Sequence, residues 1–341
     1  MKSLVQALCA LIAFSLLTGC GSESATKLVP KAVLPKEGFS EKPKDFTVFN
    51  PKVDILFVID NSGSMESVQQ TLSRNAYLFA DAMSKVSILD YHIGVISTDM
   101  ELCGYFNRDN CGKLIGTPSF VSKTTPDLVN VLSRKMVLGT NGSATEEMFS
   151  PVMEALSLPL ENTVNVGFHR QDAFLAVIFI TDAKEQSKYS PQDFLQFLNT
   201  KKTDPSRVLA YGVIRKLAEE TICRGMEELD DKLENFLAIV SNGDKSQKNI
   251  LSLCLPDYGV KLAEFAKDIV RRSAGTVKLS RIPNVKTIKV SYGTQVIPNS
   301  ATSGWVYQPS TNSILLSEGI NWNYQGPGVG LSIDFEVVDV N

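Results

Sequence analysis

The fold is decided by the stretch Val53-Asp54-Ile55-Leu56-Phe57-Val58-Ile59-Asp60-Asn61-Ser62-Gly63-Ser64-Met65. Its first seven residues are almost all apolar and lack polar alternation, which is typical of a central parallel strand covered on both faces. The strand ends at the carboxylate of Asp60, and hydroxyls follow at Ser62 and Ser64. Gly63 between them allows the backbone to turn sharply. Three oxygen donors on one tight turn indicate a site for a small divalent cation.

The residues after this turn predict an amphipathic helix over 66–86. On this stretch alone there is a second explanation, in which Ser62 or Ser64 only caps that helix. The rest of the chain must distinguish the two. The apolar residues recur at three- and four-residue steps, at Val68, Leu72, Ala76, Phe79, Met83 and Val86.

Apolar strands alternate with amphipathic helices as far as residue 281. This order predicts an α/β fold with a mainly parallel, doubly wound sheet and helices on both faces. Sites in such sheets form at the carboxyl ends of strands, where Asp60, Asp99 and Asp182 fall. The further predicted strands are 91–98, 173–180, 208–214 and 276–279. The further predicted helices are 127–137, 146–158, 192–200 and a last one that is marked from Tyr258 and closed by Gly275.

The pattern changes after residue 281. Segments 287–292 and 329–338 alternate with a period of two, which predicts a small antiparallel β unit at the C-terminus, over 282–341. A unit of this size is marginal alone, so we expect it to pack on the main domain, residues 51–281. The segment Arg215–Pro256 within that domain carries a predicted helix and has no assigned role.

The strand and its turn resemble the von Willebrand factor A (VWA) domain, whose Asp-x-Ser-x-Ser sequence opens the metal-ion-dependent adhesion site (MIDAS). Asp60, Ser62 and Ser64 match that sequence. Thr140, after Gly139, matches the Thr of the family's second loop. Asp182 matches the Asp of the third, although Ala183 replaces the usual Gly. The matches occur in the expected order and cover residues 51–281, which favours the metal site over the helix cap.

The resemblance implies a role for each of these residues. Ser62 and Ser64 would bind the metal directly, Thr140 would do so in the high-affinity state, and Asp60 and Asp182 would act mostly through water. Such a site keeps one position open for an Asp or Glu of a protein partner. Mg²⁺ suits it because Mg²⁺ retains waters and needs few carboxylates, with Mn²⁺ and Ca²⁺ as alternatives. Asp99 is a candidate behind the direct ligands or at a second ion, and a solvated loop carboxylate is the other interpretation.

The first 50 residues predict export and anchoring. Residues 1–19 have the charge and apolar run of a signal peptide, and Leu17-Thr18-Gly19-Cys20 resembles a bacterial lipobox, in which Cys20 is lipidated. An ordinary signal peptide with an incidental Cys is the alternative. Residues 20–50 predict a flexible linker. Gly21, where an Asp would signal retention at the inner membrane, favours the outer membrane and leaves open which side the protein faces.

Four further cysteines predict disulfides in an exported protein. We expect the local pairs Cys103–Cys111 and Cys223–Cys254, although two other pairings are possible. A zinc site is a weaker alternative because the sequence has no Cys-x-x-Cys spacing and only two His.

Composition and missing motifs exclude several functions. A net charge of -3 gives no reason to expect nucleic-acid binding. The chain lacks Gly-x-Ser-x-Gly and Walker sequences, so we expect no enzyme. The expected function is membrane-anchored adhesion to a protein on another cell or in the extracellular matrix. The alternative is an envelope structural or assembly factor that binds a partner of the same cell.

Overall fold

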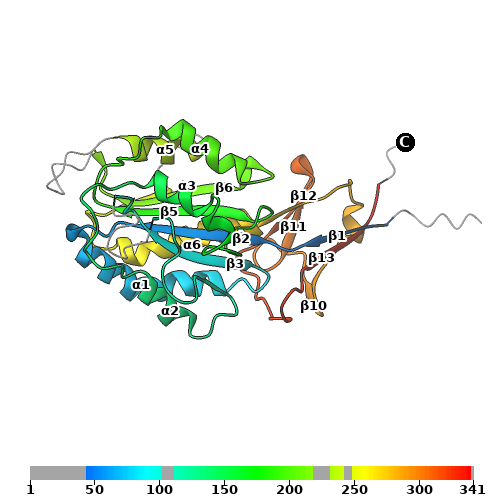
Figure 1. Ribbon diagram of the computed structural model, residues 1–341. Coiled ribbons are helices and arrows are strands. Elements are labelled where there is room, and N and C mark those ends of the chain that lie inside the picture. Colours follow the sequence, from blue (N-terminus) through cyan, green and yellow to red (C-terminus); the bar gives the residue numbers. More distant parts are fainter. Residues whose placement is uncertain (1–43, 102–110, 218–230, 242–247, 339–341) are drawn as a thin grey trace, which may run out of the picture. The chain divides into compact units, whose positions relative to one another are not determined.

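A six-stranded, mostly parallel sheet forms the centre of the computed structural model, which describes residues 44–101, 111–217, 231–241 and 248–338 (Figure 1). The strand order is β4-β3-β2-β5-β6-β7, and only β4 runs antiparallel to its neighbour. The α/β fold class expected from the sequence is confirmed. The strands are β2 (Lys52–Ile59), β3 (Asp90–Ser97), β4 (Phe120–Ser122), β5 (Phe174–Thr181), β6 (Val208–Ile214) and β7 (Ile250–Ser252).

The apolar runs form the middle strands of this sheet. Helices cover both faces of the sheet there, so both sides of these strands are buried. β2 pairs with β3 and with β5 along nearly its whole length, and every residue of 53–59 is buried. The core on one face includes side chains of α1 (Glu66–Ser84), α2 (Leu128–Lys135) and α6 (Tyr258–Ala274). The core on the other face includes α3 (Phe149–Ala155), α4 (Pro191–Thr200) and α5 (Lys232–Val240).

Two antiparallel sheets form a second unit. The first has the order β1-β13-β9-β10 and the second β11-β12-β8, and a separate apolar core contains residues of both. Ile88, from the loop between α1 and β3, belongs to this core and ties the unit to the main domain. The strands are β1 (Lys44–Phe49), β8 (Thr276–Lys278), β9 (Lys289–Tyr292), β10 (Gln295–Ile297), β11 (Trp305–Gln308), β12 (Ser313–Leu316) and β13 (Leu331–Glu336).

Two strands of this unit lie outside residues 282–341, the range predicted for it. The linker expected over 20–50 includes β1, which pairs with β13 over the whole of Lys44–Phe49. β8, expected as the last strand of the main sheet, pairs with β12 instead. The C-terminal unit thus takes β1 from the predicted linker and β8 from the end of the predicted main domain. β1 also leads straight into β2 after Asn50 and Pro51, and β2 continues in the direction of β1 (Figure 1).

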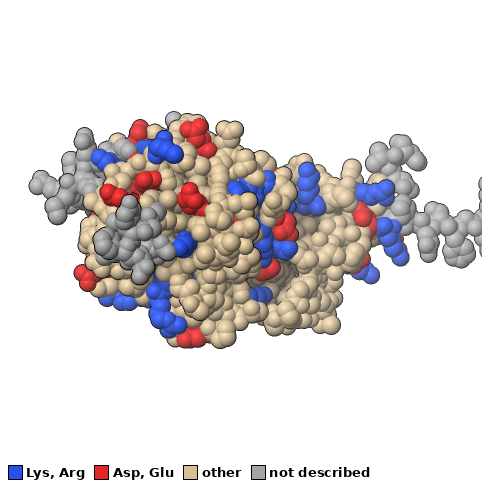
Figure 2. Space-filling view, viewed as in Figure 1, with Lys and Arg blue, Asp and Glu red and all other residues tan. Residues whose placement is uncertain are grey.

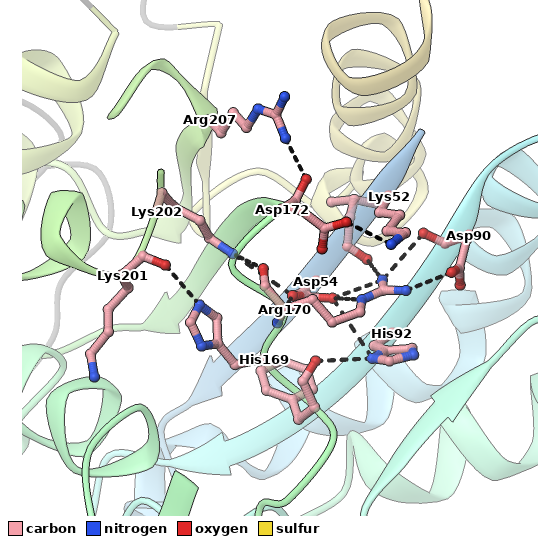
Figure 3. A network of polar contacts seen from close by, with 12 residues as sticks. Lys52, Asp54, Asp90, His92, His169, Arg170, Asp172, Lys201, Lys202 and Arg207 are labelled. Atoms are coloured by element: carbon pink, nitrogen blue, oxygen red, sulfur yellow. Dashed lines mark hydrogen bonds and ion pairs between the residues drawn. The ribbon is translucent and has the colours of Figure 1, made fainter. Parts of the chain in front are cut away.

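A network of buried ions lies at the amino ends of the central strands (Figure 3). Asp54 is fully buried and accepts hydrogen bonds from the backbone N–H and Nε of Arg170, at 2.7 and 2.8 Å. The Nζ of Lys202, whose side chain is also buried, lies 3.8 Å from the same carboxylate. Burial raises the pKa of Asp54, and the two neighbouring cations oppose that shift. Arg170 also binds Asp90 at 2.7 Å, which joins β2 to β3.

Cys111 and Cys254 are each disulfide-bonded. Their expected partners, Cys103 and Cys223, lie outside the described residues, so the pairing stays a prediction. Cys20 and the signal peptide also lie outside them. No helix in the described part of the chain combines the length and the apolar character that a membrane span needs.

Candidate metal centre

Asp60 lies at the carboxyl end of β2 and is fully buried. Its backbone N–H bonds to the carbonyl of Ile180 at 3.0 Å, which continues the pairing of β2 with β5 by one residue. Its side chain accepts two hydrogen bonds, from the N–H of Ser62 at 2.8 Å and from Oγ1 of Thr181 at 2.7 Å. The carboxylate is therefore fixed between the first and third predicted loops. The sequence motif alone gives no role for Thr181.

The two serine hydroxyls and the carboxylate of Asp182 form one chain of oxygens. Oγ of Ser62 lies 3.1 Å from Oγ of Ser64, which in turn donates to Oδ1 of Asp182 at 3.0 Å. In an octahedron with Mg–O distances of about 2.1 Å, neighbouring ligand atoms lie about 3.0 Å apart. The spacing of these three oxygens therefore fits neighbouring positions around one Mg²⁺ ion.

The loop that carries Thr140 lies beside this turn. The backbone N–H of Gly142 donates to the carbonyl of Asn61 at 2.9 Å. Gln69 of α1 donates from Nε2 to the carbonyls of Asp60 and Gly139, each at 2.9 Å. The half-buried Thr140 thus stands between two residues that are fixed to the Asp60 turn. Sequence reasoning missed Gln69, although it lies three residues before Leu72 on the buried face of the helix, where a polar residue is unusual.

Among the described residues, no cationic side chain balances the negative charge of this site. Burial raises the pKa of Asp60, and the nearby Asp182 carboxylate raises it further, while the hydrogen bonds from Ser62 and Thr181 lower it. Within the described part of the chain, no Lys, Arg or His side chain forms an ion pair with Asp60 or Asp182. A buried carboxylate without a cation is unfavourable. A bound divalent cation would supply the missing charge.

Two further observations concern the donor set. Among the described residues, no group of three or more His, Cys, Asp and Glu side chains could hold a metal ion. Oδ1 of Asn61 is buried and has no hydrogen-bond partner among the residues that the structure describes. A water bound in the site would satisfy it, since buried polar atoms rarely stay unpaired. The residues present therefore fit a hard cation held by hydroxyls and water.

Asp99 follows β3 and is buried. Its backbone forms an isolated β-bridge with Glu146. Oε2 of Glu146 accepts a hydrogen bond from the hydroxyl of Thr98. Helix α3 begins only at Phe149, so the helix expected to start at Glu146 was placed too early. Glu146 therefore joins the third strand to the loop before α3 instead of sitting at a helix N-terminus.

Comparisons with known proteins give only distant structural similarity. No protein-family model matches the chain, and no curated protein matches it. Among solved structures, proximal thread matrix protein 1 from the mussel byssus is similar at 10% identity and a TM-score of 0.41, over 70% of this chain and 52% of that one. The chain thus spans about half of the mussel protein. The mussel protein is also known with a zinc-occupied MIDAS motif, in a structure similar at 12% identity and a TM-score of 0.37, over 67% of this chain and 47% of that one.

Two other similar structures are bacterial. A von Willebrand factor type A protein from Catenulispora acidiphila matches at 11% identity and a TM-score of 0.35, over 87% of this chain and 66% of that one. The pilus adhesin SpaC from Lactobacillus rhamnosus GG matches at 12% identity and a TM-score of 0.39, over 84% of this chain and 38% of that one. Similarity this low concerns the arrangement of strands and helices and assigns no function.

Proposed function

We propose that this protein binds a divalent cation at the carboxyl edge of its central sheet and uses it to capture an Asp or Glu side chain of a protein partner. The metal residues are Asp60, Ser62, Ser64, Thr140 and Asp182. Mg²⁺ is the proposed ion, Cys20 the proposed lipid anchor in the bacterial envelope, and adhesion the proposed role rather than catalysis.

One observation carries the proposal. Asp54 and Asp60 are both fully buried, but Asp54 is paired with Arg170 and Lys202, whereas Asp60 has no protein cation within the described residues. The hydroxyls in front of Asp60 are neutral ligands. A cation held mainly by neutral oxygens keeps much of its charge and its affinity for a further carboxylate. The site therefore suits capture of an acidic group from outside.

Metal binding can be tested by titration calorimetry with Mg²⁺ and Mn²⁺. We expect one site in the wild-type protein and strongly weakened binding in Asp60→Ala. Asp172→Ala is the matched control, because Asp172 is exposed and pairs with Lys52 at the opposite end of the strands. Equal affinity in the wild-type protein and Asp60→Ala would refute the metal site.

Capture of a partner needs its own experiment. We expect beads coated with the protein to capture the target from envelope extracts or to attach to cells that carry it. Attachment should be lost in Asp60→Ala and in Thr140→Ala, and EDTA should remove it reversibly. Attachment that survives both the substitutions and EDTA would exclude the metal as the adhesive element. Protease digestion of intact cells separates the roles, because accessibility favours adhesion and full protection favours an assembly factor.

A further inference from the structure

We propose that Gln69 positions Thr140 for metal binding by bridging three segments: helix α1, the turn after β2, and the loop that begins at Leu138. The inference rests on the proposed metal site and assigns that site a residue outside its three loops. Gln69 does not touch the metal in this proposal. It acts by fixing the backbone next to Thr140.

The amide of Gln69 has its full set of hydrogen bonds. Nε2 donates to the carbonyls of Asp60 and Gly139, each at 2.9 Å. Oε1 accepts from the N–H groups of Leu138 and Gly139, at 2.8 and 3.1 Å. A carboxamide has two donor hydrogens and two acceptor lone pairs, so all four are used. Gln69 is 1% exposed, so its hydrogen bonds are shielded from bulk water.

No other side chain of this length can make the same bridge. Glu at position 69 would place an acceptor against the two carbonyls, and Met would leave two carbonyls and two N–H groups without partners. The bridge also holds Gly139 at a φ of 85°, in the left-handed region that favours glycine. Gln69 thus fixes the residue immediately before Thr140 in a conformation that sets where the next side chain emerges.

A second contact fixes the other side of Thr140. The N–H of Gly142 donates to the carbonyl of Asn61, and a Cβ on Gly142 would lie 2.7 Å from the Asn61 side chain. The backbone is therefore held before and after Thr140, in both cases to the turn that begins at Asp60. Partners that orient a metal ligand from behind typically change metal affinity about 10- to 100-fold when they are removed.

A double-mutant cycle tests the proposal. Mn²⁺ affinity is measured by calorimetry for Gln69→Glu and Gln69→Met, each in the wild-type and the Thr140→Ala background. We expect the Gln69 substitutions to weaken binding about tenfold or more when Thr140 is present. In the Thr140→Ala background, where the positioned hydroxyl is gone, we expect little further change. Gln70→Glu is the control, because Gln70 is the exposed neighbour and its side chain reaches only Glu66.

Amide hydrogen exchange of the wild-type protein gives a second test that needs no variant. The N–H groups of Leu138 and Gly139 should exchange far more slowly than those of an open loop. Fast exchange there, or equal Mn²⁺ affinity in the wild-type protein and both Gln69 variants, would overturn the inference. An equal loss in both backgrounds would also overturn it, because Gln69 would then not act through Thr140. A wild-type protein that binds no Mn²⁺ would instead refute the proposed function itself.

Discussion

Asp54 and Asp60, six positions apart, are both buried, but their electrostatic surroundings differ. The carboxylate of Asp54 is surrounded by Arg170, Lys202 and His92, so its charge is compensated inside the protein. Asp60 accepts hydrogen bonds from Ser62 and Thr181 and lies near the Asp182 carboxylate, and among the described residues no cation pairs with it. The sequence predicted Asp60 as a site residue because hydroxyls follow it closely. It could not identify the partners of Asp54, which are distant in sequence, nor Gln69, whose role depends on a loop that follows 69 residues later.

The Asp54 network predicts a large effect on stability. Asp54→Ala removes the carboxylate that lies against both Arg170 and Lys202 and leaves the buried Lys202 without that partner, so we expect a loss of about 3–5 kcal/mol in the free energy of unfolding. Asp172→Ala breaks an exposed pair with Lys52 and should cost less than about 1 kcal/mol. Urea denaturation of both variants checks this. A loss at Asp54 as small as that at Asp172 would contradict the prediction.

Lys135 predicts a pH dependence. Its Nζ donates to the carbonyls of Ile115 and Ser119, and burial lowers its pKa to about 8. Between pH 8 and about 10 the unfolded lysine still binds a proton that the folded one has released. The free energy of unfolding contributed by this group should therefore rise with pH across that window. Lys135→Met removes the contribution, so wild type should gain stability relative to the variant from pH 7.5 to 9.5. Parallel profiles from urea denaturation would refute this.

Among the elements, those with a continuous apolar run were predicted most closely. The bounds of β6 matched, β2 begins one residue earlier than expected, and β5 is displaced by one residue. The agreement is close because burial on both faces gives an unbroken apolar run. β1 was missed for the opposite reason. Its apolar side chains Phe46 and Val48 are 58% and 53% exposed, and only Phe49 packs on a core. Its first residues, Lys44 and Asp45, are charged, as in a linker.

The role of β1 can be tested by truncation. A chain starting at Pro51 lacks the six-residue ladder of β1 with β13, together with Phe49, which packs on the second core. We expect it to lose roughly 3 kcal/mol or more of stability, because each ladder hydrogen bond contributes about 0.5–1.5 kcal/mol. A chain starting at Lys42 keeps β1. Its melting temperature should equal that of a chain that lacks only the first 20 residues. Equal melting temperatures of the two truncations would restore the linker interpretation.

At the scale of the whole molecule, the main domain and the β unit are not consecutive pieces of sequence. Along the described residues, the chain passes first through β1 of the β unit, then forms the central sheet, and returns to the β unit at β8. On the face drawn in Figure 2, acidic and basic side chains are interspersed, in keeping with a net charge of -3. Short-range chemistry at the metal site, rather than a long-range field, is then what would select a partner.

The direct passage from β1 into β2 has a mechanical consequence. The backbone from Lys44 to Asp60 is almost entirely strand, at a rise of about 3.3 Å per residue, close to the limit of an extended chain (Figure 1). A force applied between an anchor at Lys44 and a partner bound at the serine hydroxyls would act on a segment that is already fully extended. In single-molecule pulling, handles at 44 and 63 should show no stepwise lengthening before the tether breaks. Handles at 44 and 338 pull on adjacent ends of the antiparallel pair β1 and β13, so they should unzip it at low force and release long lengths of chain. Length increases of tens of ångströms between handles at 44 and 63 would disprove this prediction. Their absence would mean that the segment transmits force from the anchor to the partner without unfolding.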